Sequence, residues 1–187
     1  RHGPTGLSKM SKPKYSVLIH GGAQERHRRA GTENVTGIIG LAKAAEIATA
    51  NMKERTAEEI KVRDHLIERI EKEIPYAKLN GDRVKRLPNN VNFSFQFVEG
   101  ESLLIKLDMK GICGSSGSAC TSGSLDPSHV LLAIGLPHEI AHGSLRMTLS
   151  AETTKEDIDY TIDNLKEIVA HLRSMSPLYE DFMRKQK

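Results

Sequence analysis

The chain of 187 residues suits one domain of ordinary size, and its 38% hydrophobic and 27% charged residues are typical of a soluble globular protein. A formal net charge of +3 and only 4% aromatic residues argue against a nucleic-acid partner. No apolar run reaches the roughly 20 residues that a membrane span needs, and no signal peptide opens the chain. Cys113 and Cys120 are too few for a disulfide scaffold or a structural zinc site. We therefore expect a cytoplasmic protein without a membrane partner or a metal site.

Two helices are predicted in the first half of the chain. Residues 1–17 contain scattered glycine, proline and lysine and read as a loop. Apolar residues then recur every three or four positions over 41–52, which predicts an amphipathic helix. A second helix is expected over 57–73, with isoleucines on one face, and Pro75 ends it.

The second half alternates predicted strands with predicted helices. Residues 91–97 and 145–149 alternate apolar and polar side chains, which favours two strands, and Arg146 lies on the polar face of the second. Short helices are expected over 101–109 and 128–134. A capping-box pattern over 153–156 begins a long helix. The order of elements predicts an α+β fold, a small and mainly antiparallel sheet with helices on one face.

Residues 115–124 contain no side chain larger than threonine, and Cys120 lies among them. Such a segment buries little apolar area, so its thiol should be accessible, as a reactive cysteine requires. A glycine-rich surface loop that merely contains a cysteine is the alternative interpretation. A redox or metal pair of Cys113 with Cys120 is a further alternative, but this C-x6-C spacing fits no common motif.

The segment Ser-Ser-Gly-Ser-Ala-Cys-Thr-Ser-Gly at 115–123 is very similar to the active-cysteine loop of pyridoxal-phosphate-dependent cysteine desulfurases. These enzymes of iron–sulfur cluster assembly and nitrogen fixation have the type I, aspartate aminotransferase-like fold. Other segments resemble the same family in the same order. They are GGAQE at 21–25, RAGTEN at 29–34, LPNNVN at 87–92, VEGES at 98–102, LDPSHV at 125–130, AHGSLR at 141–146 and LRSMSPLY at 172–179. The resemblance covers nearly all of 18–179.

The resemblance implies a domain and a role for each matching residue. Residues 1–40 would be the tail of the large cofactor domain and a dimer-contact arm, and 41–187 the C-terminal small domain with the active-cysteine loop. Cys120 would be the catalytic nucleophile that takes sulfur as a persulfide. Arg146 would bind the substrate α-carboxylate with its guanidinium fork. Thr32 would bind the phosphate of pyridoxal 5'-phosphate in the partner subunit of a homodimer.

The implied reaction converts L-cysteine to L-alanine, and the persulfide sulfur then passes to an iron–sulfur scaffold protein. The family's Schiff-base lysine would directly precede a segment like 1–6, so this chain does not contain it and is expected to be inactive alone. Residues 7–15 and the pair Ala151 and Glu152 depart from the family pattern. A selenocysteine lyase is the nearest alternative enzyme. A non-catalytic module that docks a sulfur acceptor through residues 175–187 is the alternative from another class.

Overall fold

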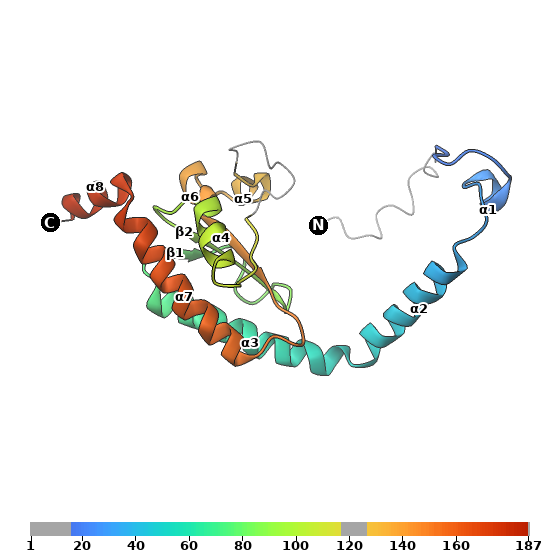
Figure 1. Ribbon diagram of the computed structural model, residues 1–187, viewed down its shortest axis with the longest axis horizontal. Helices are drawn as coiled ribbons and strands as arrows, with labels where there is room; N and C mark the ends of the chain where they lie inside the picture. Colours follow the sequence, from blue (N-terminus) through green and yellow to red (C-terminus); the bar gives the residue numbers. More distant parts are fainter. Residues whose placement is uncertain (1–15, 117–126, 187) are drawn as a thin grey trace. The chain divides into compact units, whose positions relative to one another are not determined.

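The computed structural model describes residues 16–116 and 127–186, and the chain divides between Ala50 and Asn51 into two units (Figure 1). The first unit contains α1 (Gln24–His27) and α2 (Val35–Ala50). In α1, Glu25, Arg26 and His27 have φ between 50° and 62°, so this segment is a left-handed turn. We describe each unit by itself.

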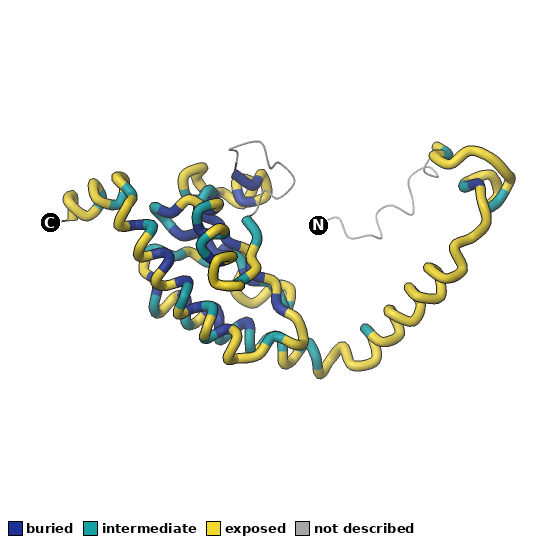
Figure 2. The backbone as a smooth tube through the Cα atoms, viewed as in Figure 1, coloured by how far each residue is buried: buried dark blue, intermediate teal, exposed yellow. Residues whose placement is uncertain are grey.

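The predicted helix over 41–52 is interrupted, because α2 ends at Ala50 and Met52 begins the next helix. None of the residues of α2 is buried, as the exposed colour along it shows in Figure 2. Leu41, for example, is 74% exposed. The apolar stripe predicted for this helix is thus present in the sequence but packs against no core within the described part of its unit.

The second unit is the α+β arrangement that the sequence predicts. Its elements are α3 (Met52–Glu73), β1 (Ala77–Leu79), β2 (Asn90–Phe95), α4 (Gly100–Asp108), α5 (His129–Ala133), α6 (His138–His142), β3 (Ser144–Thr148), α7 (Lys155–Ser174) and α8 (Pro177–Lys185). The strands form an antiparallel sheet in the order β1-β2-β3. In its register, Phe93 lies opposite both Leu79 and Leu145. The small antiparallel sheet is confirmed.

One face of the sheet carries the core. Alternate residues of β2 and β3 point to this face, where they pack against α3, α4 and α7. The largest fully buried side chains are Phe93, Phe95, Leu66, Ile67, Ile70, Leu103, Leu107, Leu145, Ile162 and Leu165. Figure 2 shows the buried residues gathered between the sheet and these helices. Burial of each such side chain contributes about 1.5–3 kcal/mol.

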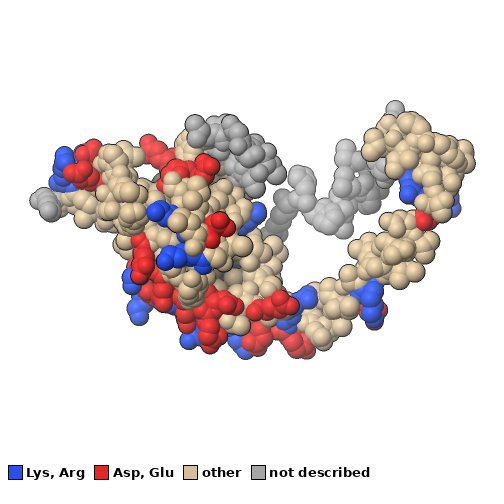
Figure 3. Space-filling view, viewed as in Figure 1, with Lys and Arg blue, Asp and Glu red and all other residues tan. Residues whose placement is uncertain are grey.

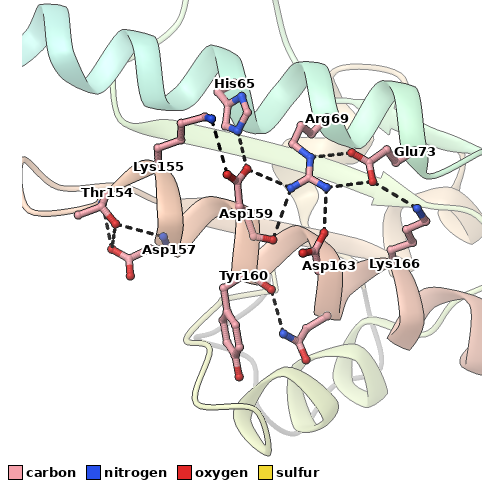
Figure 4. Close-up of polar contacts among 11 residues, drawn as sticks. His65, Arg69, Glu73, Thr154, Lys155, Asp157, Asp159, Tyr160, Asp163 and Lys166 are labelled. Carbon is pink, nitrogen blue, oxygen red and sulfur yellow. Dashed lines mark hydrogen bonds and ion pairs between the residues drawn. The ribbon is translucent and has the colours of Figure 1, made fainter.

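Charged side chains join α3 to α7 outside the core. Arg69 of α3 donates to Glu73 Oε1 at 2.6 Å, to Asp163 Oδ1 at 2.9 Å and to Asp159 Oδ1 at 3.0 Å (Figure 4). His65 Nε2 lies 2.6 Å from Asp159 Oδ1. Acidic and basic side chains of the second unit mingle along this edge in Figure 3. The network fixes how the two long helices lie against each other.

Several predicted boundaries are wrong. The strand expected to reach Phe97 ends at Phe95, because the chain turns at Gln96 and Phe97 has a φ of 64°. The capping box that begins α7 joins Thr154 to Asp157, one residue later than the pattern suggests. Neither β1 nor α6 was predicted from the sequence. Within the part of the chain that the structure describes, no helix is long and apolar enough to cross a membrane.

Candidate functional site

The face of the sheet opposite the core carries a row of polar side chains. Asn92 of β2 lies directly opposite Arg146 of β3, and the alternation that buries their neighbours turns both to this face. Asn80, which follows β1, extends the row on the far side of Asn92. Its backbone N–H donates to Asn92 O at 2.9 Å, and its side-chain Nδ2 donates to Asn92 Oδ1 at 2.6 Å. These bonds fix the orientation of the Asn92 amide.

Ser115 continues the row beyond β3. Its N–H donates to Arg146 O at 3.0 Å, and Arg146 N–H donates to Ser115 O at 2.6 Å, which forms an isolated antiparallel bridge. Arg146 Nη2 also lies 3.4 Å from Ser115 Oγ. The backbone of Arg146 is therefore tied to the chain two residues before the segment 117–126.

A cavity of about 400 Å³ opens beside this row. Polar side chains from the sheet and apolar side chains from α5 line it. Its lining residues are Asn80, Gly81, Asp82, Lys85, Arg86, Leu87, Asn90, Asn92, Ser128, Val130, Leu131, Ile134 and Arg146. Three of these residues are cationic and one is acidic, so the lining favours a small anion such as a carboxylate.

The guanidinium of Arg86 is held in the cavity wall by contacts to backbone oxygens. Arg86 Nη2 donates to Asn80 O at 2.6 Å and its Nε donates to Asp82 O at 2.8 Å. Burial lowers the pKa of the Arg86 guanidinium from its ordinary value, and the positive charge of Arg63 acts in the same direction. Backbone N–H groups of Lys85 and Val84 lower the pKa of Asp82, which keeps this carboxylate charged.

The two cysteines differ in their surroundings. Cys113 is exposed and lines a separate cavity of about 410 Å³, next to Met147, Asp157 and Tyr160. This second cavity borders the helix-covered side of β3, whereas Arg146 lines the cavity on the polar side. Cys120 lies outside the described residues, so its predicted role as nucleophile remains a prediction.

Thr32 belongs to the first unit and is exposed. Arg29 holds the backbone on which it stands, because its Nη1 donates to Gly31 O at 3.1 Å and to Thr32 O at 2.9 Å. Gly31 has a φ of 91°, a left-handed conformation that glycine adopts without strain. The arrangement leaves the Thr32 hydroxyl on the surface of its unit, where it can donate to an anionic group.

Arg146 was predicted from the sequence as a site residue, but its neighbours Asn80, Asn92 and Ser115 were not. The strand alternation placed Asn92 on a polar face, and this was the signal available from the sequence. Its pairing with Arg146 depends on the register between β2 and β3, which the sequence does not show. Asn80 joins the row through a strand that was not predicted. Ser115 was grouped with the small residues of the cysteine segment rather than with the sheet.

Comparisons with known proteins show which family the chain resembles. The family model for aminotransferase class-V matches residues 7–161. The chain is 56% identical over its whole length to the cysteine desulfurase IscS of Clostridium botulinum strain Hall, of which it covers 48%. It is 58% identical to the cysteine desulfurase IscS of Methanosarcina thermophila, with 88% of this chain and 41% of the relative covered. The chain thus spans about half the length of these curated relatives.

Solved structures show a similar fold. The NifS-like protein of Rickettsia africae matches with a TM-score of 0.72 and 33% identity, over 82% of this chain and 39% of that one. Another NifS-like protein matches with a TM-score of 0.71 and 34% identity, over 83% and 39% of the two chains.

Proposed function

Because the chain belongs to the aminotransferase class-V family, and the family resemblance drawn from its motifs is confirmed, we propose that it supplies the sulfur-accepting part of a cysteine desulfurase. The observation that carries this proposal is the backbone bridge between Ser115 and Arg146, because Arg146 lines the cationic cavity and Ser115 lies five residues before Cys120. The overall reaction is L-cysteine plus the Cys120 thiol giving L-alanine plus the Cys120 persulfide.

Arg146 binds the α-carboxylate of L-cysteine. Its guanidinium offers a planar pair of donors that matches a carboxylate, and Lys85 and Arg86 add positive charge to the same cavity. The amide of Asn92, whose oxygen is engaged by Asn80, keeps its N–H groups for the ligand. The row therefore orients the substrate at one end and leaves the sulfur free.

Cys120 accepts the sulfur. It follows Ser115 by five residues, a length of chain that can span at most about 18 Å. The thiolate is the nucleophile in such a transfer, and a segment of small residues places few side chains in its way. Cys113, next to the other cavity, serves no such role in this proposal.

Pyridoxal phosphate fits the residues present only in part. The exposed hydroxyl of Thr32, on a backbone held by Arg29, suits one hydrogen bond to the cofactor phosphate of a partner subunit. We propose accordingly that 1–40 form the dimer-contact arm of a homodimer and 41–187 the small domain. When bound, the cofactor supplies the electron sink that makes the α-proton of the amino acid acidic. A cytoplasmic location and an iron–sulfur scaffold as sulfur acceptor complete the proposal.

A chimera tests this function. The chain replaces the segment that it matches in the Clostridium botulinum relative, and alanine formation from L-cysteine is measured. We expect activity, and Arg146→Lys should raise KM for L-cysteine about tenfold or more, because loss of bidentate binding costs about 1.5–3 kcal/mol. A folded chimera whose KM is indifferent to Arg146→Lys would contradict the role of Arg146. A higher rate on selenocysteine than on cysteine would favour the lyase instead.

The docking module remains a second candidate, because α8 exposes apolar side chains. Leu178 is 67% exposed and Met175, just before the helix, is 57% exposed. Capture of an iron–sulfur scaffold protein by the 187-residue chain alone, lost on Leu178→Glu, would support it. If the chimera captures the scaffold protein and the 187-residue chain does not, docking needs residues of both parts of the chimera.

A further inference from the structure

Helix α6 carries two histidines one helical turn apart, and their side chains meet. The ring centroids of His138 and His142 are 4.6 Å apart, with an angle of 66° between the ring planes. His138 is exposed and His142 is half-buried, so solvent reaches both residues. Other residues line the Arg146 cavity, and the proposed desulfurase reaction uses neither imidazole.

The separation of the rings matches that of two imidazoles bound to one metal ion. A ring centroid lies about 3.2 Å from a metal bonded to one of its nitrogens at about 2.1 Å. Two imidazoles that bind neighbouring positions of a square-planar or octahedral ion, about 90° apart, would have centroids about 4.5 Å apart, close to the 4.6 Å between His138 and His142. A tetrahedral zinc site would hold the centroids about 5.2 Å apart.

The backbone beneath the two rings is rigid. Ala141, between them, is buried and packs with Leu131 and Leu136. Gly143, directly after His142, passes so close to the β2 end that an added Cβ would lie 2.2 Å from Phe95 O. Because α6 is fixed in this way, the two imidazoles lose little further freedom when they bind an ion together.

The charge around His142 also favours a cation. The Glu99 carboxylate interacts electrostatically with His142, while its oxygens accept hydrogen bonds from Glu101 N and Ser102 N. It therefore contributes negative charge without being needed as a ligand. Among residues 16–116 and 127–186, no group of three His, Cys, Asp or Glu could hold a metal ion. Water must fill the remaining coordination positions.

We propose that His138 and His142 form a surface site for a divalent ion of the copper or nickel type. The sequence His-Glu-Ile-Ala-His at 138–142 has the spacing of a metalloprotease zinc helix. The two-ligand set and the ring geometry instead assign a binding site without hydrolytic chemistry. The expectation of no metal site rested on the two cysteines alone.

Calorimetric titration of the 187-residue chain with Ni²⁺ tests the site. Cys113→Ser and Cys120→Ser are included in every protein so that thiols do not compete, and the titration is run at about pH 7.5 because imidazole binds metals in its neutral form. His138→Gln and His142→Gln are compared with His171→Gln, a matched control at an exposed position of α7.

Loss of either α6 imidazole should weaken the tightest Ni²⁺ site at least about tenfold, since even outer partners of metal ligands change affinity about 10–100-fold. His171→Gln should leave it unchanged. In the unsubstituted histidine background, substoichiometric Ni²⁺ should broaden the amide resonances of α6 before others. Equal affinity in all variants, or broadening elsewhere, would overturn the site. Tighter binding of Zn²⁺ than of Ni²⁺ would overturn the assigned metal class.

Discussion

Ser115 and Arg146 pair through both of their backbone N–H groups, at 3.0 Å and 2.6 Å, so that an isolated antiparallel bridge ties the chain before the cysteine segment to β3. Ser115→Pro removes one of these donors and should let Arg146 shift. In the chimera we expect KM for L-cysteine to rise several-fold. Ser115→Ala, which keeps both backbone bonds, is the control and should stay close to the unsubstituted protein. Equal KM values for Ser115→Pro and Ser115→Ala would show that the backbone bridge does not contribute to substrate binding.

The ion pairs between α3 and α7 predict a loss of stability in acid. A hydrogen bond from Arg69 lowers the pKa of Glu73, and His65, followed by Arg69, lowers the pKa of Asp159. Carboxylates with a depressed pKa stabilise the fold above their ordinary pKa of about 4, and this contribution disappears as the pH falls through the lowered values. The urea midpoint should therefore fall between about pH 5 and pH 3.

Arg69→Met separates this network from other acid effects. The variant should have a lower urea midpoint at neutral pH and a smaller drop in acid, because the pKa values of Glu73 and Asp159 return toward normal. Arg184→Met is the control, since Arg184 pairs with Glu180 on the exposed α8. An identical pH profile for Arg69→Met and the unsubstituted chain would refute the assignment.

Gly143 is predicted to tolerate no side chain. An added Cβ would lie 2.2 Å from Phe95 O and 2.8 Å from Val98 O, both of them backbone atoms that cannot move aside cheaply. Gly143→Ala should lower the free energy of unfolding by at least about 1–3 kcal/mol, as overpacking does. Gly40→Ala in α2 has no heavy atom within 4 Å of the new Cβ and should raise helix content instead. Urea titration followed by circular dichroism measures both effects.

Arg173 links the end of α7 to the sheet. It is buried, and it donates from Nε to Gln96 O at 3.0 Å and from Nη2 to Tyr76 O at 3.3 Å. Its guanidinium carbon lies 5.9 Å from the ring centroid of Tyr179 in α8. Burial lowers the pKa of Arg173 from its ordinary value.

Arg173→Met should therefore cost about 1–3 kcal/mol and loosen α8, because the half-buried carbonyls of Gln96 and Tyr76 each lose a donor and Tyr179 loses a cation. Hydrogen exchange of α8 amides should accelerate in this variant. Arg184→Met should leave that exchange unchanged. Acceleration in neither variant would show that aromatic packing alone holds α8.

Elements whose residues interact mainly with near neighbours in the sequence were predicted from apolar spacing and strand alternation. The long helix α7 and the polar placement of Arg146 follow from apolar spacing and strand alternation, and both are confirmed. The three-residue strand β1 is too short to alternate, and its pairing with β2 depends on contacts across the fold. Asn80 and Asn92, 12 residues apart, meet only because of that pairing. Arg146 could therefore be predicted from the sequence, but its pairing with Asn92 and the position of Asn80 beside them could not.

The position of sulfur after one turnover tests directly whether Cys120 is the sulfur acceptor. The chimera is treated with L-cysteine, alkylated and digested, and mass spectrometry locates the persulfide. Its two cysteines within this chain provide a matched pair, because Cys120→Ser should abolish the modification and alanine formation, whereas Cys113→Ser should preserve both. A persulfide on Cys113, or undiminished alanine formation by Cys120→Ser, would contradict the assignment of Cys120 as the sulfur acceptor.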